Sequence, residues 1–360
     1  MKNLGNVRIK RLIAIAGSAQ ELFEKKQGEL MNIEGVDRVI AGEIYAARSR
    51  QDELEREFDS VMEMCEKKNT RITTIFDDDY PENLKMIFDA PVFLFYKGNL
   101  SELDRFSISV VGTRIPSEYG KIVCTNLVEG ISELGIPIIS GMANGIDAIA
   151  HMTALKSKNL TYAVLGSGVD MPYPPENEKL YHSICENGAV ISELDFGAIP
   201  DRVNFPRRNR IICGISLGTL VVESALKGGS LITAQLALDQ NKEVFAVPGY
   251  INSRNSSGTN ELIKKGHAKM VTNVEDIVCE LEYKLAPLIR KPREEKNQEL
   301  VKTLNVTEQK IYSNLAYEPM NIDMINEQTG LPVSDCLVNL LSLELKGLVR
   351  QIPGKNFMKL

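Results

Sequence analysis

Several apolar segments of this chain end in glycine turns of the kind that bind phosphate groups. Each turn places glycine, with hydroxyl or basic side chains beside it, directly after an apolar run. Glycine after a buried strand lets backbone N–H groups approach a phosphate at a helix N-terminus. The candidate binding residues of these turns are Gly112, Thr113, Arg114, Ser140, Gly141, Gly145, Gly166, Ser167, Gly168, Gly228, Gly229 and Ser230. Their succession predicts a surface that holds several phosphates in a row.

A basic stretch lies between the third turn and the fourth. It has four arginines and no acid between positions 202 and 210. Guanidinium groups donate forked hydrogen bonds to phosphate oxygens, and a phenyl ring offers a flat face to a base. The candidates here are Arg202, Asn204, Phe205, Arg207, Arg208, Asn209 and Arg210. We expect them to bind single-stranded nucleic acid; the alternative is a core Phe205 and a structural Asn209-Arg210 pair that opens the next helix.

Catalytic residues are sparse in this sequence. The three histidines are isolated, and neither a P-loop nor a G-x-S-x-G motif is present. Glu223, ahead of Gly228-Gly229-Ser230, resembles the acid of phosphoribohydrolases that act on nucleoside monophosphates. Two interpretations of Glu223 are open, a catalytic acid or a buried acid that pairs with turn amides. For Asp147 we expect a helix-capping role. We expect no enzyme, no metal and no cofactor.

Composition and charge are those of a globular protein. Of the 360 residues, 43% are hydrophobic and 25% charged, and the formal net charge is −6. The negative balance excludes a uniformly basic surface but leaves room for a local phosphate-binding patch. No apolar run reaches the length of a membrane span and no signal peptide is evident, so we expect a cytoplasmic protein. The six cysteines are far apart, and we interpret them as buried thiols.

The central part of the chain alternates apolar strands with helical segments. The strands are expected at residues 106–111, 136–139, 161–165, 189–192, 219–222 and 243–247. Continuous β-branched runs are typical of strands buried on both faces of a parallel sheet. The pattern predicts a doubly wound α/β domain, in which ligands bind outside the carboxyl ends of the strands.

Smaller segments flank this domain. The expected boundaries are a helical, SAM or helix-hairpin-helix-like domain at 1–70, a connecting segment at 71–105, the α/β domain at 106–283, a linker at 284–300 and a winged-helix-like domain at 301–360. The last assignment depends on three short helices followed by a hairpin with Pro353-Gly354 at its tip. Its third helix has Asp335 and Glu344 and few base-reading side chains, so contact with DNA and contact with protein are both open.

Eight motifs together resemble the DNA-processing protein A family, also called DprA or Smf. They are VVGTRIPSEYG (110–120), SGMANGIDAIAH (140–151), VLGSGVDMPYPPENEKLY (164–181), ISELDFG (191–197), FPRRNRII (205–212), KGGSLITAQLAL (227–238), EVFAVPG (243–249) and SSGTNELIKKGHA (256–268). They follow the order of the family and cover the whole central domain.

This resemblance implies an extended Rossmann-like domain that binds single-stranded DNA as a homodimer. It further implies delivery of the DNA to the RecA recombinase during DNA uptake, natural transformation and recombination. DNA-binding positions of the family fall on Arg114, Arg202 and Phe205. The chain departs from the family at Asn144, where many relatives have a larger or basic residue, and the N-terminal segment matches weakly.

Overall fold

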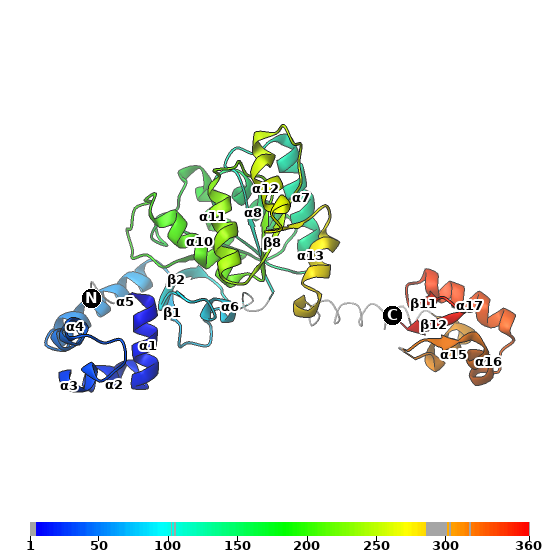
Figure 1. Ribbon diagram of the computed structural model, residues 1–360, viewed down its shortest axis with the longest axis horizontal. Coiled ribbons are helices and arrows are strands. Elements are labelled where there is room, and N and C mark those ends of the chain that lie inside the picture. Colours follow the sequence, from blue (N-terminus) through cyan, green and yellow to red (C-terminus); the bar gives the residue numbers. More distant parts are fainter. Residues whose placement is uncertain are drawn as a thin grey trace. The chain divides into compact units, whose positions relative to one another are not determined.

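A computed structural model describes residues 5–285, apart from 102, 104 and 105, and residues 301–359, apart from 302, 303 and 317 (Figure 1). The chain forms two compact units, Met1–Leu285 and Ala286–Leu360, which we describe one at a time. From position 286 onward, the linker expected at 284–300 lies outside the described residues. None of the helices in these ranges is long and apolar enough to cross a bilayer.

The first unit is built on a nine-stranded sheet with the order β1-β2-β6-β5-β4-β3-β7-β8-β9. The strands are β1 (Arg71–Thr74), β2 (Phe93–Gly98), β3 (Ile108–Val111), β4 (Ile138–Ser140), β5 (Thr161–Val164), β6 (Gly188–Ser192), β7 (Gly218–Val221), β8 (Glu243–Ala246) and β9 (Lys269–Met270). From β3 the chain proceeds through β4 and β5 to β6 on one side, and then through β7 and β8 to β9 on the other. The predicted doubly wound α/β fold is therefore confirmed.

The sheet is mixed, whereas the sequence pattern predicts only parallel strands. Every adjacent pair in the row β6-β5-β4-β3-β7-β8-β9 is parallel. At the other edge, β2 pairs antiparallel with both β6 and β1. Leu94, Phe95 and Tyr96 of β2 are all buried. Because both faces of β2 are covered, its apolar run resembles that of a parallel strand, and its direction cannot be read from composition.

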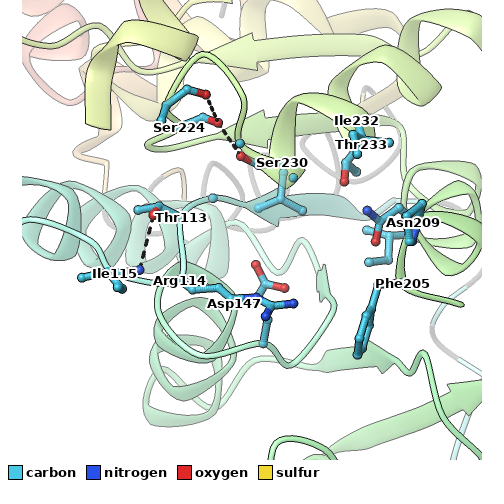
Figure 2. Close-up of a pocket in the computed structure, with 18 of the residues that line it drawn as sticks. Thr113, Arg114, Ile115, Asp147, Phe205, Asn209, Ser224, Ser230, Ile232 and Thr233 are labelled. Carbon is cyan, nitrogen blue, oxygen red and sulfur yellow. Dashed lines mark hydrogen bonds between the residues drawn. The ribbon is translucent and has the colours of Figure 1, made fainter. Parts of the chain in front are cut away.

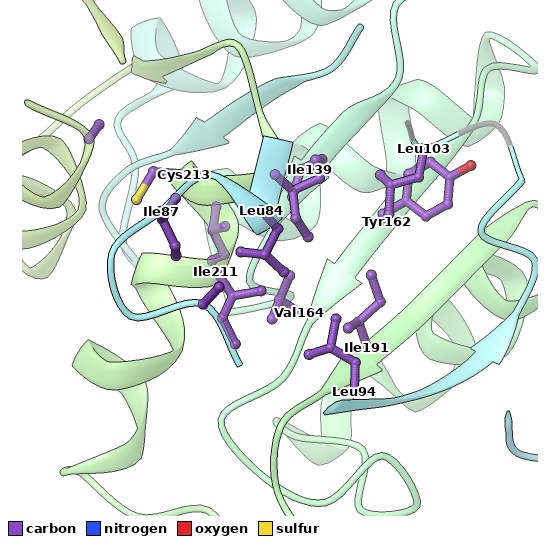
Figure 3. Close-up of a cluster of buried hydrophobic side chains, with 14 of the residues drawn as sticks. Leu84, Ile87, Leu94, Leu103, Ile139, Tyr162, Val164, Ile191, Ile211 and Cys213 are labelled. Carbon is purple, nitrogen blue, oxygen red and sulfur yellow. The ribbon is translucent and has the colours of Figure 1, made fainter. Parts of the chain in front are cut away.

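Helices cover both faces of the sheet, as the alternation of buried side chains along β5 shows. Tyr162 and Val164 belong to one apolar cluster, together with Ile211 of α10 (Figure 3). Ala163 belongs to a second cluster with Ile184 of α9, on the opposite face. The helices of this region are α6 (Glu82–Lys85), α7 (Glu118–Glu133), α8 (Ile146–Lys156), α9 (Glu178–Glu186), α10 (Asn204–Ile215), α11 (Gly229–Asp239), α12 (Ser257–Lys264) and α13 (Val274–Glu280).

A bundle of five helices precedes the sheet. Its members are α1 (Asn6–Ala16), α2 (Ala19–Glu24), α3 (Gln27–Met31), α4 (Arg38–Arg48) and α5 (Gln51–Lys67). Two of these helices have side-chain N-caps. The Ser18 side chain accepts a hydrogen bond from Glu21 N at the start of α2, and the Asp37 side chain accepts one from Val39 N at the start of α4. The bundle is tied to the α/β part by Lys68, whose Nζ lies 3.0 Å from Asp170 Oδ2.

The second unit is a winged helix. Three helices, α15 (Val306–Asn314), α16 (Ile322–Thr329) and α17 (Val333–Leu345), precede the hairpin of β11 (Val349–Ile352) and β12 (Asn356–Lys359), and β10 (Met320–Asn321) completes the sheet. The helices pack around Ile311, Leu340 and Phe357. At the tip of the hairpin, Gly354 has a φ of +88°, which glycine adopts without strain. The winged helix predicted from the sequence is confirmed.

The cysteines differ in burial. Cys65, Cys124, Cys213 and Cys336 are buried, and Cys185 is partly buried. The expectation of six buried thiols is wrong for Cys279, which is exposed near the end of α13. The terminal turn of a helix that packs at the edge of the domain leaves this side chain in solvent.

Candidate nucleic-acid interface

The candidate site lies where the winding of the sheet changes direction. Strand β3 pairs with both β4 and β7, and the chain leaves this centre toward opposite edges. A pocket of about 660 Å³ opens at the carboxyl ends of these strands. Figure 2 shows Thr113 and Arg114 of the β3 loop on one side of this pocket and Phe205 and Asn209 of α10 on the other. Such a crevice is the usual ligand position in open α/β sheets.

Part of the predicted residue set meets in this pocket. Gly112, Thr113, Arg114, Phe205, Arg208, Asn209, Gly228, Gly229 and Ser230 all line it. A smaller cavity of about 60 Å³ adjoins it and is lined by Gly141 and Tyr173. Arg114 and Phe205 line both cavities and so lie between them.

Arg114 and Phe205 form a contact pair where the two cavities meet. The guanidinium carbon of Arg114 lies 5.6 Å from the centroid of the Phe205 ring, within cation–π range. The Tyr173 ring lies against the Phe205 ring, with the two centroids 5.8 Å apart and the two planes inclined at 33°. Arg114 is exposed and Phe205 is partly buried. A positive charge and two aromatic rings are thus presented together at one place.

The glycines of the first three turns make room for protein side chains. A Cβ atom on Gly112 would lie 2.6 Å from Ile146 Cγ1, and one on Gly166 would lie 2.7 Å from Phe205 Cδ1. A Cβ on Gly141 would lie 2.6 Å from Nη2 of Arg208. In the fourth turn, a Cβ on Gly229 would meet nothing within 4 Å. The glycines therefore let helices α8 and α10 approach the strand ends closely, and Gly229 leaves its backbone open to the pocket.

The arginines of the basic stretch take different positions. Arg208 is buried, and its Nη1 donates to the carbonyl oxygens of Gly141, at 2.9 Å, and of Val164. Burial lowers the pKa of Arg208 to about 10, against the opposing effect of the nearby Asp147 carboxylate. Arg208 ties α10 to the ends of two strands, so its side chain is held from within the protein.

Arg210 is also buried and is held by acids. Its Nη2 lies 2.5 Å from Glu193 Oε2, and its Nε lies 3.2 Å from Asp89 Oδ2. Arg202 and Arg207 are exposed, and Asn204 is the first residue of α10. None of these four side chains lines the central pocket.

Asp147 lies under the second turn. The predicted N-cap role is wrong: Gly145 is the N-cap of α8, and the Asp147 carboxylate accepts from Gly141 N at 3.2 Å. The loop between β4 and α8 folds back over the start of α8. The Asp147 carboxylate therefore accepts a hydrogen bond from the residue that follows β4, and not from an amide of the helix. Burial raises the pKa of Asp147 to about 6, although the charge of Arg208 lowers it.

Glu223 is buried beneath the first turn. Its carboxylate accepts from Ser117 N at 2.9 Å and from Ser117 Oγ at 2.5 Å. Ser117 is the N-cap of α7. Glu223 does not line the pocket, and both of its oxygens are engaged in fixing this helix start.

The remaining predicted serines and glycines support the turns from inside. Ser140 Oγ donates to Val110 O at 2.6 Å and Ser167 Oγ donates to Met171 O at 2.7 Å. Gly145 has a φ of +87°, and Gly168 lies against the Asp195 carbonyl. These residues shape the turns without lining the pocket.

Residues after β8 also line the pocket and were not predicted. Arg254 is exposed there, and Asn255 Nδ2 donates to Ile115 O at 3.0 Å. Both follow the strand next to β7, whose carboxyl end faces the same crevice. Their position after a strand end could have identified them, because ligands bind at the carboxyl ends of strands in such sheets. The long turn after β8, however, has only Gly249 near its start as a sequence signal.

The fold and the site together define a doubly wound α/β protein with a positively charged, aromatic crevice at its switch point and an appended winged helix. The chain belongs to the DNA recombination-mediator protein A family. The model of that family matches residues 71–282, and the DprA winged helix domain matches residues 295–355.

Individual relatives agree with this assignment. Protein Smf of Escherichia coli is 38% identical over 290 residues, which cover 80% of this chain and 77% of the relative. The X-ray structure of DNA processing protein A from Streptococcus pneumoniae superposes with a TM-score of 0.63 at 35% identity, covering 77% of this chain and 98% of that one. DNA processing protein A of Helicobacter pylori, whose unique single-stranded DNA binding mode has been described structurally, superposes with a TM-score of 0.54 at 30% identity, covering 60% and 98%.

Proposed function

We propose that this chain binds single-stranded DNA at the switch-point pocket. The observation that supports this most strongly is the Arg114–Phe205 pair between two adjoining cavities. In the proposed complex the Arg114 guanidinium contacts a backbone phosphate, and a base stacks beside the Phe205 ring. Stacking of a base on an aromatic side chain contributes about 1–3 kcal/mol and tolerates any sequence.

A single strand suits this pocket better than a duplex does. In a duplex the base faces are covered by neighbouring base pairs, so an aromatic ring inside a pocket has no face to stack on. A free strand exposes its bases and brings a phosphate next to each of them. The open backbone at Gly229 and the exposed Arg254 offer further donors to that backbone.

The arrangement of acids gives no support to the alternative, a nucleoside-monophosphate hydrolase. Glu223 would have to reach a substrate from the pocket wall, but it is buried and bonded to Ser117. Asp147 is the only carboxylate among the described residues that line the pocket, and it is buried beside Arg208. We therefore propose a non-enzymatic role.

Family membership supports a role in recombination. We propose that the protein acts as a homodimer, protects incoming single-stranded DNA in the cytoplasm and loads RecA onto it during natural transformation. Light scattering on the purified protein measures the oligomeric state. ATP hydrolysis by RecA on DNA precoated with single-strand-binding protein measures loading; no acceleration by this protein would contradict it.

The binding proposal is tested with two substitutions and a matched control. Arg114→Ala removes the phosphate contact, and Phe205→Leu keeps apolar volume while it removes the stacking face. We expect each to weaken binding of a fluorescent oligo-dT about tenfold in anisotropy titrations. The control is Arg38→Ala at the exposed start of α4. Unchanged affinity in both pocket variants would refute the assignment.

A further inference from the structure

A second cleft adjoins the switch-point pocket. It has a volume of about 650 Å³ and lies between the start of α1 and helices α10 and α11. Pro206 and Ile232 line both cavities, so the two meet across these side chains. Pro206 is exposed and Ile232 is 46% exposed, which makes the boundary an open apolar ridge and not a closed wall.

Helix α10 distributes its side chains between the two cavities. Phe205, Arg208 and Asn209 line the first, whereas Arg207 and Arg210 line the second. Successive residues of a helix point about 100° apart, so neighbouring arginines face different cavities. The two arginines of α10 that do not line the first pocket therefore line a second surface.

The charge of this second cleft is positive. Three arginines, Arg8, Arg207 and Arg210, line it together with a single carboxylate, that of Asp89. Arg210 lies beside Asp89 and also binds Glu193, which neutralises these acids in part. Arg8 and Arg207 are exposed and come from different elements, α1 and α10.

The start of α1 is attached to the α/β part at this cleft. Asn6 Nδ2 donates to Glu193 Oε1 at 2.6 Å, the same carboxylate that binds Arg210. Farther along α1, Lys10 Nζ donates to Lys85 O at 3.5 Å. These contacts hold Arg8 on the rim of a cavity whose other side is α10.

We propose that this second cleft binds backbone phosphates of the same single strand, after the strand crosses the ridge of Pro206 and Ile232. The inference rests on the proposed function of the first pocket and extends it. Arg207 and Arg8 contact phosphates that the first pocket does not reach, and the apolar ridge contacts the sugar or base between them. The N-terminal helices thereby take a direct part in DNA binding.

The test measures how affinity depends on the length of the strand. Oligo-dT of about 5 to 30 nucleotides spans the site sizes usual for single-strand binding. Anisotropy titrations compare the wild type with Arg207→Ala, with the double variant Arg8→Ala/Arg207→Ala, and with Arg114→Ala. Arg38→Ala is the charge-matched control, and thermal unfolding verifies that each variant is folded.

We expect the double variant to bind the longest oligonucleotides about tenfold more weakly and the shortest ones almost normally. Its salt dependence on long strands should also become shallower, by about 0.7 in the logarithmic slope for each lost phosphate contact. Arg114→Ala should weaken binding at every length.

Two results would overturn the proposal that the second cleft binds DNA. One is an unchanged length dependence in the double variant, and the other is equal weakening at all lengths. If Arg114→Ala still weakens binding in either case, only the extension fails. If the wild type retains no oligonucleotide of any length, the proposed function fails with it.

Discussion

At the scale of single residues, the four arginines near Phe205 show how one local pattern separates into different roles. Arg208 and Arg210 are buried and bonded to carbonyls or acids, whereas Arg202 and Arg207 are exposed. The structure places Phe205 against Gly166 of the third glycine turn. The sequence predicts the whole stretch as a candidate binding segment. It could not predict which guanidinium groups the protein itself would engage, because their partners, such as Glu193 and Val164, are distant in sequence.

Gly166 allows a prediction at this scale. A methyl group at Gly166 would lie 2.7 Å from the Phe205 ring, so Gly166→Ala should displace the ring from its place beside Arg114. Overpacking of this kind costs about 1–3 kcal/mol of stability. Loss of stacking should weaken oligo-dT binding about tenfold.

Anisotropy and thermal unfolding measure the two effects separately. The matched control is Gly28→Ala in α3, where an added Cβ meets nothing within 4 Å. Normal DNA affinity in a folded Gly166→Ala protein would show that the position of the ring is unimportant for binding.

At the scale of elements, the central strands could be located from the sequence because they are short runs of almost continuously buried residues. The expected strand at 161–165 is observed as Thr161–Val164, and the one at 189–192 as Gly188–Ser192. Strand β1 has a mixed burial pattern and no apolar run, so it was not predicted. The position of Asp147 depends on how the turn after β4 folds back over α8, which spacing does not determine.

The stability of the protein should depend on pH through helix α8, because burial shifts the pKa values of two of its side chains in opposite directions. Burial lowers the pKa of His151 to about 3, whereas burial raises the pKa of Asp147 to about 6. A lowered His pKa costs stability as pH falls below about 6.5, where the unfolded chain takes up the proton. A raised Asp pKa acts the other way, since below pH 6 the folded state takes up the proton first.

The free energy of unfolding, measured with urea at pH 7 and pH 5, tests both signs. On going from pH 7 to pH 5 the His151 effect costs about 2 kcal/mol of stability and the Asp147 effect returns about 1 kcal/mol. His151→Gln should therefore become more stable at pH 5 than at pH 7, and Asp147→Asn should lose more stability than the wild type. The same pH dependence in all three proteins would contradict these assignments.

At the scale of the whole molecule, the winged helix and the switch-point pocket belong to separate compact units. Helix α17 has no lysine or arginine, and its exposed side chains include Val338, Leu341 and Leu345. Lys346, just after it, lies 2.6 Å from Glu308 and holds the pKa of that carboxyl near 2 through this hydrogen bond. The third helix, which contacts the bases in many winged helices, is therefore apolar in this protein, and its charged residues are the acids Asp335 and Glu344.

Deletion of residues 286–360 should leave single-strand affinity within about threefold of the full chain, because few phosphate contacts are lost. Anisotropy with oligo-dT measures this, and circular dichroism verifies that the remaining unit is folded. A loss of affinity of about a hundredfold would show that the principal binding site is in the winged helix.

The central claim is that the switch-point pocket recognises a single strand through a charge and a stacking face. A competition titration of single-stranded against duplex DNA of equal length, at two salt concentrations, tests it most directly. We expect the single strand to bind about tenfold or more tightly at both concentrations, while both affinities fall with salt. We further expect Phe205→Leu to reduce this preference. Equal affinity for the two forms in the wild-type protein would contradict the account.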